Sequence, residues 1–245
     1  MLALRRLIAA AMAVALIACQ PVGSNPSGSS TPSASATVEV DGERLIDAFL
    51  RLVKADAFTA RTEMSGVLTA GALQLGLQAS GTLRGGDGTM TLKLNTVSDH
   101  VEFEAIFVGE YGYVRLSEGE WQRVPREDVN TSGARLDSFN FITAGDDLRY
   151  EGIATHDGAV VHVLANTRAL PLAGSGAAAE DASGKATKLR ILVLADGTPV
   201  FLSYHMTVTI DDGTGAKVAA RGDIEQSFTD VGEPIVIAPP SGFSD

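Results

Sequence analysis

The stretch LSYHMTVTI, residues 202–210, decides the fold class, because its hydrophobic and polar side chains alternate strictly. Side chains of a β-strand point alternately to the two faces of a sheet, so this period of two indicates a strand with one apolar and one polar face. The same alternation recurs over 73–83, 90–95, 101–107, 188–193 and 217–228. Such strands are typical of an antiparallel sheet that is exposed to water on one side.

Glycine-rich turns separate these segments. Gly85-Gly86-Asp87-Gly88, Asp157-Gly158, Asp196-Gly197 and Asp212-Gly213 all have the composition of hairpin connections. The chain therefore alternates strands and tight turns, as in a meander.

Few segments of the folded part have helical character. Asp41–Ala55 carries an apolar stripe at helical spacing, and Asp41 is placed to cap it. A short helix is predicted near Ala134–Phe141, and part of Leu170–Ala182 is a third candidate. The last overlaps a Gly/Ala/Ser-rich insertion, 172–186, which we expect to be a mobile loop.

A sheet of this size must cover its apolar face. We therefore predict an α+β fold in which a single large curved antiparallel sheet, a half-barrel, wraps a few helices and leaves an internal apolar groove. Packed core is the alternative explanation for the same hydrophobic rows, since only an actual void would make a binding site. The candidate groove residues are Leu73, Leu75, Leu77, Met90, Leu92, Leu94, Val101, Phe103, Leu202, Tyr204 and Met206.

The N-terminus has the features of an export signal. Arg5 and Arg6 precede the apolar run Leu7–Ile17, which is too short for the roughly 20 residues that span a bilayer. The run ends in Leu16-Ile17-Ala18-Cys19, which resembles the lipobox of bacterial lipoproteins. This resemblance implies removal of a signal peptide, residues 1–18, and lipidation of Cys19. The chain would then be anchored by acyl chains at the extracytoplasmic face of the cell membrane.

A tether follows the anchor. Residues 20–40 are rich in Ser, Pro and Gly and show no apolar periodicity, which is typical of disorder. We therefore divide the chain into a signal peptide (1–18), a lipidated cysteine with its tether (19–40) and one β-rich domain (41–245). Since Cys19 is the only cysteine, no intramolecular disulfide can form.

The charge of the chain is acidic. Loss of Arg5 and Arg6 with the signal peptide changes the formal net charge from −11 to −13. A surface of this sign repels nucleic acid and anionic lipid head groups. We therefore expect no nucleic-acid partner and no basic membrane-binding patch.

No motif for catalysis stands out. The sequence has no G-x-S-x-G, HExxH or Walker motif, and Asp211-Asp212-Gly213 lacks the other calcium-loop ligands. A hairpin turn at Asp157-Gly158 would pair His156 with residue 159 and His162 with 153, so the two histidines are not opposite and are interpreted as surface residues. We predict no enzyme, no cofactor and no metal site.

Two further features have a structural and a functional interpretation. Trp121 could stack on a ligand, although a lone tryptophan in a β-domain is more often core. Asp146-Asp147 could bind a cation, but a solvated loop or a helix N-terminus is the favoured interpretation.

Three local sequences carry a family resemblance: the strand–turn–strand Ile106–Arg115, the G-x-W-x-x-V step Gly119–Val124 and the closing segment Phe228–Pro239. They are similar to motifs of LolA-like lipoprotein carriers, and in particular of the actinobacterial LprG/LppX group. The resemblance covers about residues 41–240. It implies a half-barrel that holds acyl chains between sheet and helices, with no catalytic residue to carry over. The 172–186 insertion departs from the family pattern.

We therefore predict a monomeric lipoprotein that binds and carries a lipid or another amphiphile. One alternative is a sensor or regulatory module that acts through a membrane-protein partner. Another is a structural or adhesion lipoprotein of the cell envelope with a filled core.

Overall fold

A computed structural model describes residues 41–96, 99–126, 139, 141–173, 183–211 and 217–243 of the chain. The predicted signal peptide, Cys19 and the tether lie outside these residues. So does most of the helix predicted near Ala134–Phe141, of which Phe139 and Phe141 are described.

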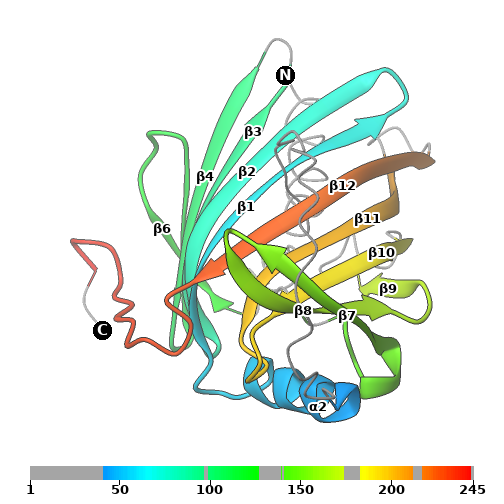
Figure 1. Ribbon diagram of the computed structural model, residues 1–245. Coiled ribbons are helices and arrows are strands. Elements are labelled where there is room, and N and C mark those ends of the chain that lie inside the picture. The colour runs from blue at the N-terminus through cyan, green and yellow to red at the C-terminus, as the bar shows by residue number, and fades with distance from the viewer. Residues whose placement is uncertain are drawn as a thin grey trace.

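The described residues form one twelve-stranded antiparallel sheet with a helix at one end (Figure 1). Its strands follow one another in the order β6-β5-β4-β3-β2-β1-β12-β11-β10-β8-β7, and β9 pairs with β10. The strands of the first half are β1 (Thr59–Ala70), β2 (Leu73–Arg84), β3 (Asp87–Asn95), β4 (His100–Val108), β5 (Tyr111–Leu116) and β6 (Gln122–Pro125). Those of the second half are β7 (Leu148–His156), β8 (Ala159–Asn166), β9 (Leu170–Ala173), β10 (Ser183–Val193), β11 (Pro199–Asp211) and β12 (Lys217–Thr229).

The two halves meet where the first and last strands pair. β1 aligns with β12 from Arg61↔Thr229 to Ala70↔Ala220, in the middle of the sheet. The edges of the path are β6 and β7, so the sheet is curved but open. These features confirm the predicted α+β fold with a single large curved antiparallel sheet.

The predicted first helix is present as α2 (Gly42–Val53). The Asp41 carboxylate accepts a hydrogen bond from the backbone N–H of Arg44 at 3.2 Å, which satisfies one of the free donors at the helix start. Leu45, Ile46 and Phe49 form its buried stripe. The helix packs chiefly against β7 and the short 3₁₀ helix η1 (Gly145–Asp147), at one end of the sheet.

The predicted hairpin turns at Gly85-Gly86, Asp157-Gly158 and Asp196-Gly197 are confirmed, and Asp212-Gly213 lies outside the described residues. The Gly85–Gly86 turn joins Arg84 to Asp87, and the Asp157-Gly158 turn joins His156 to Ala159. Asp157 and Gly158 have φ values of 48° and 80°, as a two-residue hairpin turn with the preferred twist requires.

The expectation for the 170–186 region was wrong where the structure describes it. Leu170–Ala173 is not helical but forms β9, and Ser183–Ala186 is not a loop but the start of β10. The two segments pair from Leu170↔Ala186 to Ala173↔Ser183. Backbone pairing with β10 satisfies the polar groups of a segment whose composition alone favours disorder.

Two segments of the chain cover part of the outer face of the sheet. This is the face opposite the one that the hydrophobic side chains of α2 contact. The C-terminal segment 231–243 places the ring of Phe243 at 5.2 Å from that of Tyr113. The β7–β8 hairpin places His156 at 5.0 Å from Phe201 of β11. Between them the outer face keeps the polar side chains that the alternation predicts.

Candidate functional site

The inner face of the sheet is a set of apolar rows that cross it from strand to strand. Residues that pair across strands project to the same face. One row therefore consists of Phe103, Leu92, Ala79, Met64, Gln226, Leu202, Ile191 and Leu164. A parallel row consists of Val101, Leu94, Leu77, Gly66, Ile224 and Tyr204.

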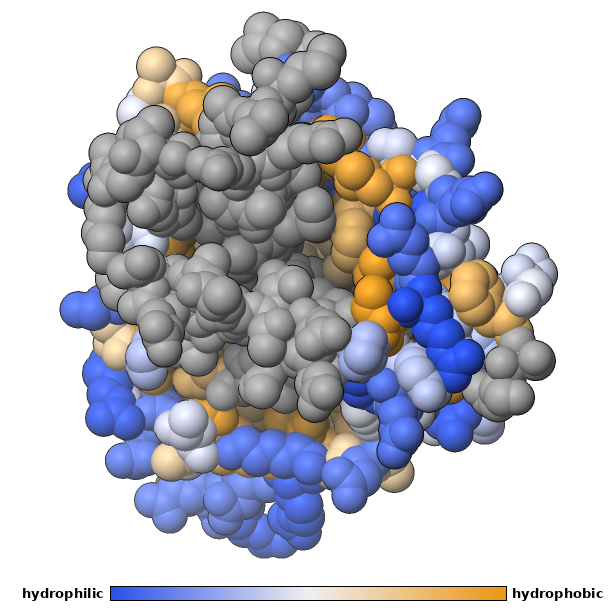
Figure 2. All heavy atoms as spheres, turned by 180° about the vertical axis from the view of Figure 1, so that it is seen from behind, coloured by the Kyte–Doolittle hydropathy of each residue, from blue (hydrophilic) through white to orange (hydrophobic). Residues whose placement is uncertain are grey.

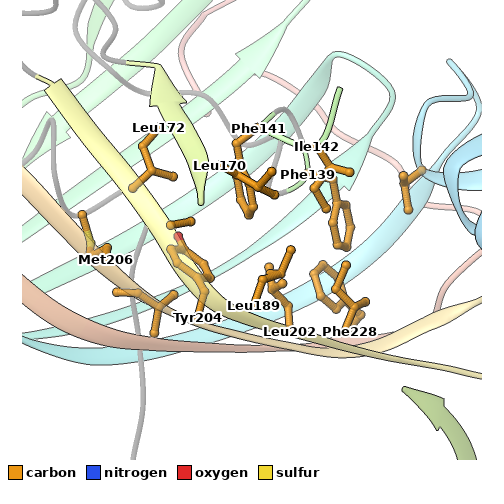
Figure 3. Close-up of a cluster of buried hydrophobic side chains, with 14 of the residues drawn as sticks. Phe139, Phe141, Ile142, Leu170, Leu172, Leu189, Leu202, Tyr204, Met206 and Phe228 are labelled. Atoms are coloured by element: carbon orange, nitrogen blue, oxygen red, sulfur yellow. The ribbon is translucent and has the colours of Figure 1, made fainter. Parts of the chain in front are cut away.

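A dense cluster of buried hydrophobic side chains lies on this face (Figure 3). Phe139 stacks on Phe228 with ring centroids 5.0 Å apart and meets Phe49 of α2 edge-on at 5.3 Å. Phe141 lies 5.3 Å from Tyr204. These ring contacts link the helix, the segment before η1 and the sheet into one core.

All eleven predicted groove residues lie on this inner face, but they differ in exposure. The fully buried ones are Leu77, Met90, Leu92, Leu94, Leu202, Tyr204 and Met206. Leu75, Val101 and Phe103 are partly buried, and Leu73 is 39% exposed. The accessible members belong to β2 and β4, on the half of the sheet away from α2. Figure 2 shows the molecule from behind, with hydrophobic residues visible inside a border of hydrophilic ones.

Several residues of the same rows were not predicted from the sequence. Met64 comes from β1, a strand that was not predicted, and Leu164 comes from β8. The inner residues of β1 include Ala60, Gly66 and Ala70, so its apolar signal is weak. Only the register with β2 and β12 places them on the face.

Asp147 is buried, so the solvated interpretation of Asp146-Asp147 was wrong for this residue, whereas the helix N-terminus is confirmed, since both residues lie in the first turn of η1. The Asp147 carboxylate is 1% exposed and accepts hydrogen bonds from the backbone N–H groups of Thr143 (2.9 Å) and Ala144 (3.0 Å). It also pairs with Arg168 at 2.6 Å. Burial raises the pKa of Asp147, but the hydrogen bonds from Arg168, Ala144 and Thr143 outweigh it and lower the pKa to about 2. This pair ties η1 to the segment after β8 and is a structural contact.

The histidine predictions were right about register and partly wrong about exposure. His156 pairs with Ala159 and His162 with Ile153, so the two rings are not opposite. His162, however, is only 6% exposed, and its Nδ1 lies 3.2 Å from the Tyr150 hydroxyl. On the outer face, His205 Nδ1 lies 2.8 Å from Asp223, whose side chain is 70% exposed.

Trp121 is not the core residue that the sequence analysis favoured. It is partly exposed, and the guanidinium of Arg115 lies 4.8 Å from its ring centroid. Within the described residues, no three His, Cys, Asp or Glu side chains gather as a metal site would require. No helix in this same part of the chain is long and apolar enough to cross a membrane.

An open curved antiparallel sheet with one hydrophobic and one polar face defines an α+β half-barrel protein. The chain belongs to a family of unknown function, DUF7537, whose family model matches residues 11–240. No curated protein sequence matches the chain.

Several solved structures are distantly similar. A DUF1329 family protein from Desulfovibrio piger is 12% identical, with a TM-score of 0.29, over 83% of this chain and 95% of the other. A LolA superfamily protein from Nitrosomonas europaea is 9% identical, with a TM-score of 0.32, over 78% of this chain and 92% of the other. An S-type phycobiliprotein lyase from Guillardia theta is 8% identical, with a TM-score of 0.24, over 70% and 87%. The fold is therefore assigned from the topology of the sheet itself.

Proposed function

We propose that this protein is a lipoprotein of the extracytoplasmic membrane face that binds and carries a lipid or another amphiphile on the inner face of its sheet. The observation that supports the proposal is the extent of that face. Apolar rows cross from β4 to β8, whereas α2 packs chiefly against β7 and η1 at one end. The half of the sheet away from α2 thus presents hydrophobic side chains that an acyl chain can cover.

The accessible residues of the inner face define where the ligand would lie. Leu73 and Leu75 on β2 and Val101 and Phe103 on β4 flank the β3 strand between them. Burial of an acyl chain against such side chains contributes about 0.8 kcal/mol per methylene group. A row of this kind selects for chain length and volume, and it selects weakly for the head group.

The anchor follows from Cys19. Acyl chains on this cysteine would hold the protein at the membrane, where an amphiphilic ligand is at its highest local concentration. The tether of residues 20–40 would let the domain reach roughly 25 Å from the anchor. The protein therefore needs no catalytic group, and its cycle consists of loading and release.

The test is native mass spectrometry of the full chain extracted from its own membrane, together with the denaturant midpoint. We expect co-purified lipid on the parent protein. Leu75→Trp fills the accessible part of the inner face and should remove this lipid with little change in the midpoint. The matched control is Val67→Trp, an exposed position on the outer face of β1, which should retain the lipid.

Two outcomes contradict the proposal. A parent protein without lipid would mean that the inner face is packed core. A clean protein mass with a retained membrane-protein partner would favour the sensor or regulatory alternative.

A further inference from the structure

The outer face of the sheet has a pocket of about 430 Å³ at its centre, on the side opposite the hydrophobic rows. Twelve residues from five neighbouring strands line it, and nine of them project to the outer face. The nine are Glu63, Ser65, Gln78, Ser80, Thr91, Lys93, Phe201, Glu225 and Ser227. The other three, Met64, Ala79 and Gln226, alternate with them along the strands and belong to the inner row.

The strand register arranges these nine residues in two adjacent rows. The first row runs from Thr91 through Ser80, Glu63 and Ser227 to Phe201. The second runs from Lys93 through Gln78 and Ser65 to Glu225. Because both rows cross hydrogen-bonded strands, the floor of the pocket is rigid backbone rather than loop.

The pocket exists because of side-chain size. Three serines, Ser65, Ser80 and Ser227, lie on the central strands β1, β2 and β12. Lys93 on β3 and Phe201 on β11 stand at one end of each row, and the longer Glu63 and Gln78 stand among the serines. The three short serine side chains leave room between these longer ones.

Phe201 is held in place at one end. Its ring lies 5.0 Å from that of His156 and packs against the cluster of Val161, Val163 and Leu192. The pocket therefore has a fixed aromatic wall beside a polar floor.

The charges of the pocket are acidic in balance. Glu63 and Glu225 contribute two carboxylates and Lys93 one ammonium group, a formal charge of −1, and the ammonium group also lies 3.3 Å from the Glu102 carboxylate. This arrangement repels phosphate and carboxylate ligands. Serine and threonine hydroxyls both donate and accept, the Gln78 amide does the same, and carboxylates accept from neighbouring hydroxyls.

We propose that this pocket binds a saccharide of one or two rings. A sugar presents closely spaced hydroxyl groups that need donors and acceptors in alternation, together with an apolar ring face that packs on an aromatic side chain. The volume lies toward the lower end of the range typical of small-molecule sites. The proposal is independent of lipid binding, because the two sites use opposite faces of the same strands.

The experiment is isothermal titration calorimetry on the full chain in micelles of lauryldimethylamine oxide, a detergent without a sugar head group. The probes are N,N′-diacetylchitobiose, cellobiose, mannobiose and trehalose. We expect saturable one-to-one binding of at least one of them. Glu63→Gln should weaken it by about tenfold, because a hydrogen bond to a charged acceptor is stronger than one to a neutral acceptor.

A filling variant tests the location. Ser80→Phe should abolish sugar binding, whereas Thr69→Phe, which lies on the outer face of β1 away from the pocket, should not. Both variants should retain co-purified lipid, so failure of this proposal is separate from failure of the carrier proposal. The proposal is overturned if none of the four sugars binds, or if Ser80→Phe binds as the parent does. Spermidine, a polycation, is titrated as a fifth probe. If spermidine binds and none of the sugars does, the proposal is likewise overturned and the carboxylates are assigned to a cation.

Discussion

Replacement of Asp147 by asparagine should make the stability of the protein less dependent on pH. In the folded protein the pKa of Asp147 is about 2, against an ordinary value of 3.8. A folded-state pKa below the unfolded one stabilises the fold above the unfolded value, and this stabilisation disappears as the pH falls toward the folded value. The shift of nearly two pH units corresponds to about 2 kcal/mol, at 1.36 kcal/mol per unit.

The hydrogen bonds of Asp147 explain why an asparagine at this position cannot replace the carboxylate. The carboxylate accepts from Thr143, Ala144 and the guanidinium of Arg168, whereas an amide offers one oxygen and its NH₂ group faces donors. We expect Asp147→Asn to lower the free energy of unfolding by about 2–3 kcal/mol at pH 7, since it leaves buried donors unmatched.

Urea titrations of the parent and of Asp147→Asn from pH 7 to pH 2 measure the difference between their free energies of unfolding. This difference should narrow by about 2 kcal/mol below pH 4. The exposed neighbour Asp146 provides the control, because Asp146→Asn should leave the pH dependence as in the parent. A gap for Asp147→Asn that stays constant from pH 7 to pH 2 would refute this account.

Two further predictions concern the anchor and the inner face. Cys19→Ala should prevent acylation and move the protein from the membrane pellet to the soluble fraction; a variant that still pellets after a high-salt wash would contradict the lipoprotein assignment. Leu92→Ala should lower the free energy of unfolding by about 3 kcal/mol, since it opens a cavity at a fully buried position. Leu73→Ala should cost less than about 1 kcal/mol because Leu73 is 39% exposed. Equal losses in the two leucine variants, measured by urea denaturation, would show that the exposure gradient along the inner face is wrong.

The fold could be predicted where the period-two pattern has large side chains. β3 and β11 bury a large hydrophobic side chain at every second position from Met90 to Leu94 and from Leu202 to Val208, and their hydrophobic rows follow from the sequence. β1 escaped prediction because Ala60, Gly66 and Ala70 occupy inner positions. Neighbouring strands, rather than its own hydrophobicity, determine its place in the sheet.

Contacts between distant residues limited the prediction of individual sites. Asp147 stands in a Gly-Asp-Asp sequence that is typical of an exposed turn. Its burial depends on the contact with Arg168, which is twenty-one positions later in the chain. His162 is buried beside Tyr150 for a similar reason. The outer pocket was equally hidden, because its serines become neighbours only through the register of β1, β2 and β12.

The two proposed sites require β1 to keep a single register with its neighbouring strands. Glu63 and Ser65 face the outer pocket while Met64, between them, belongs to the inner row. A shift of one residue in register would exchange the two faces and destroy both sites together. β1 pairs along its whole length with β2, and its alignment with β12 is close enough at Gly222 that a Cβ there would lie 2.5 Å from the Val67 carbonyl oxygen. A glycine at this close approach fixes the register, so the backbone that separates the hydrophobic face from the polar pocket is also what keeps each of them intact.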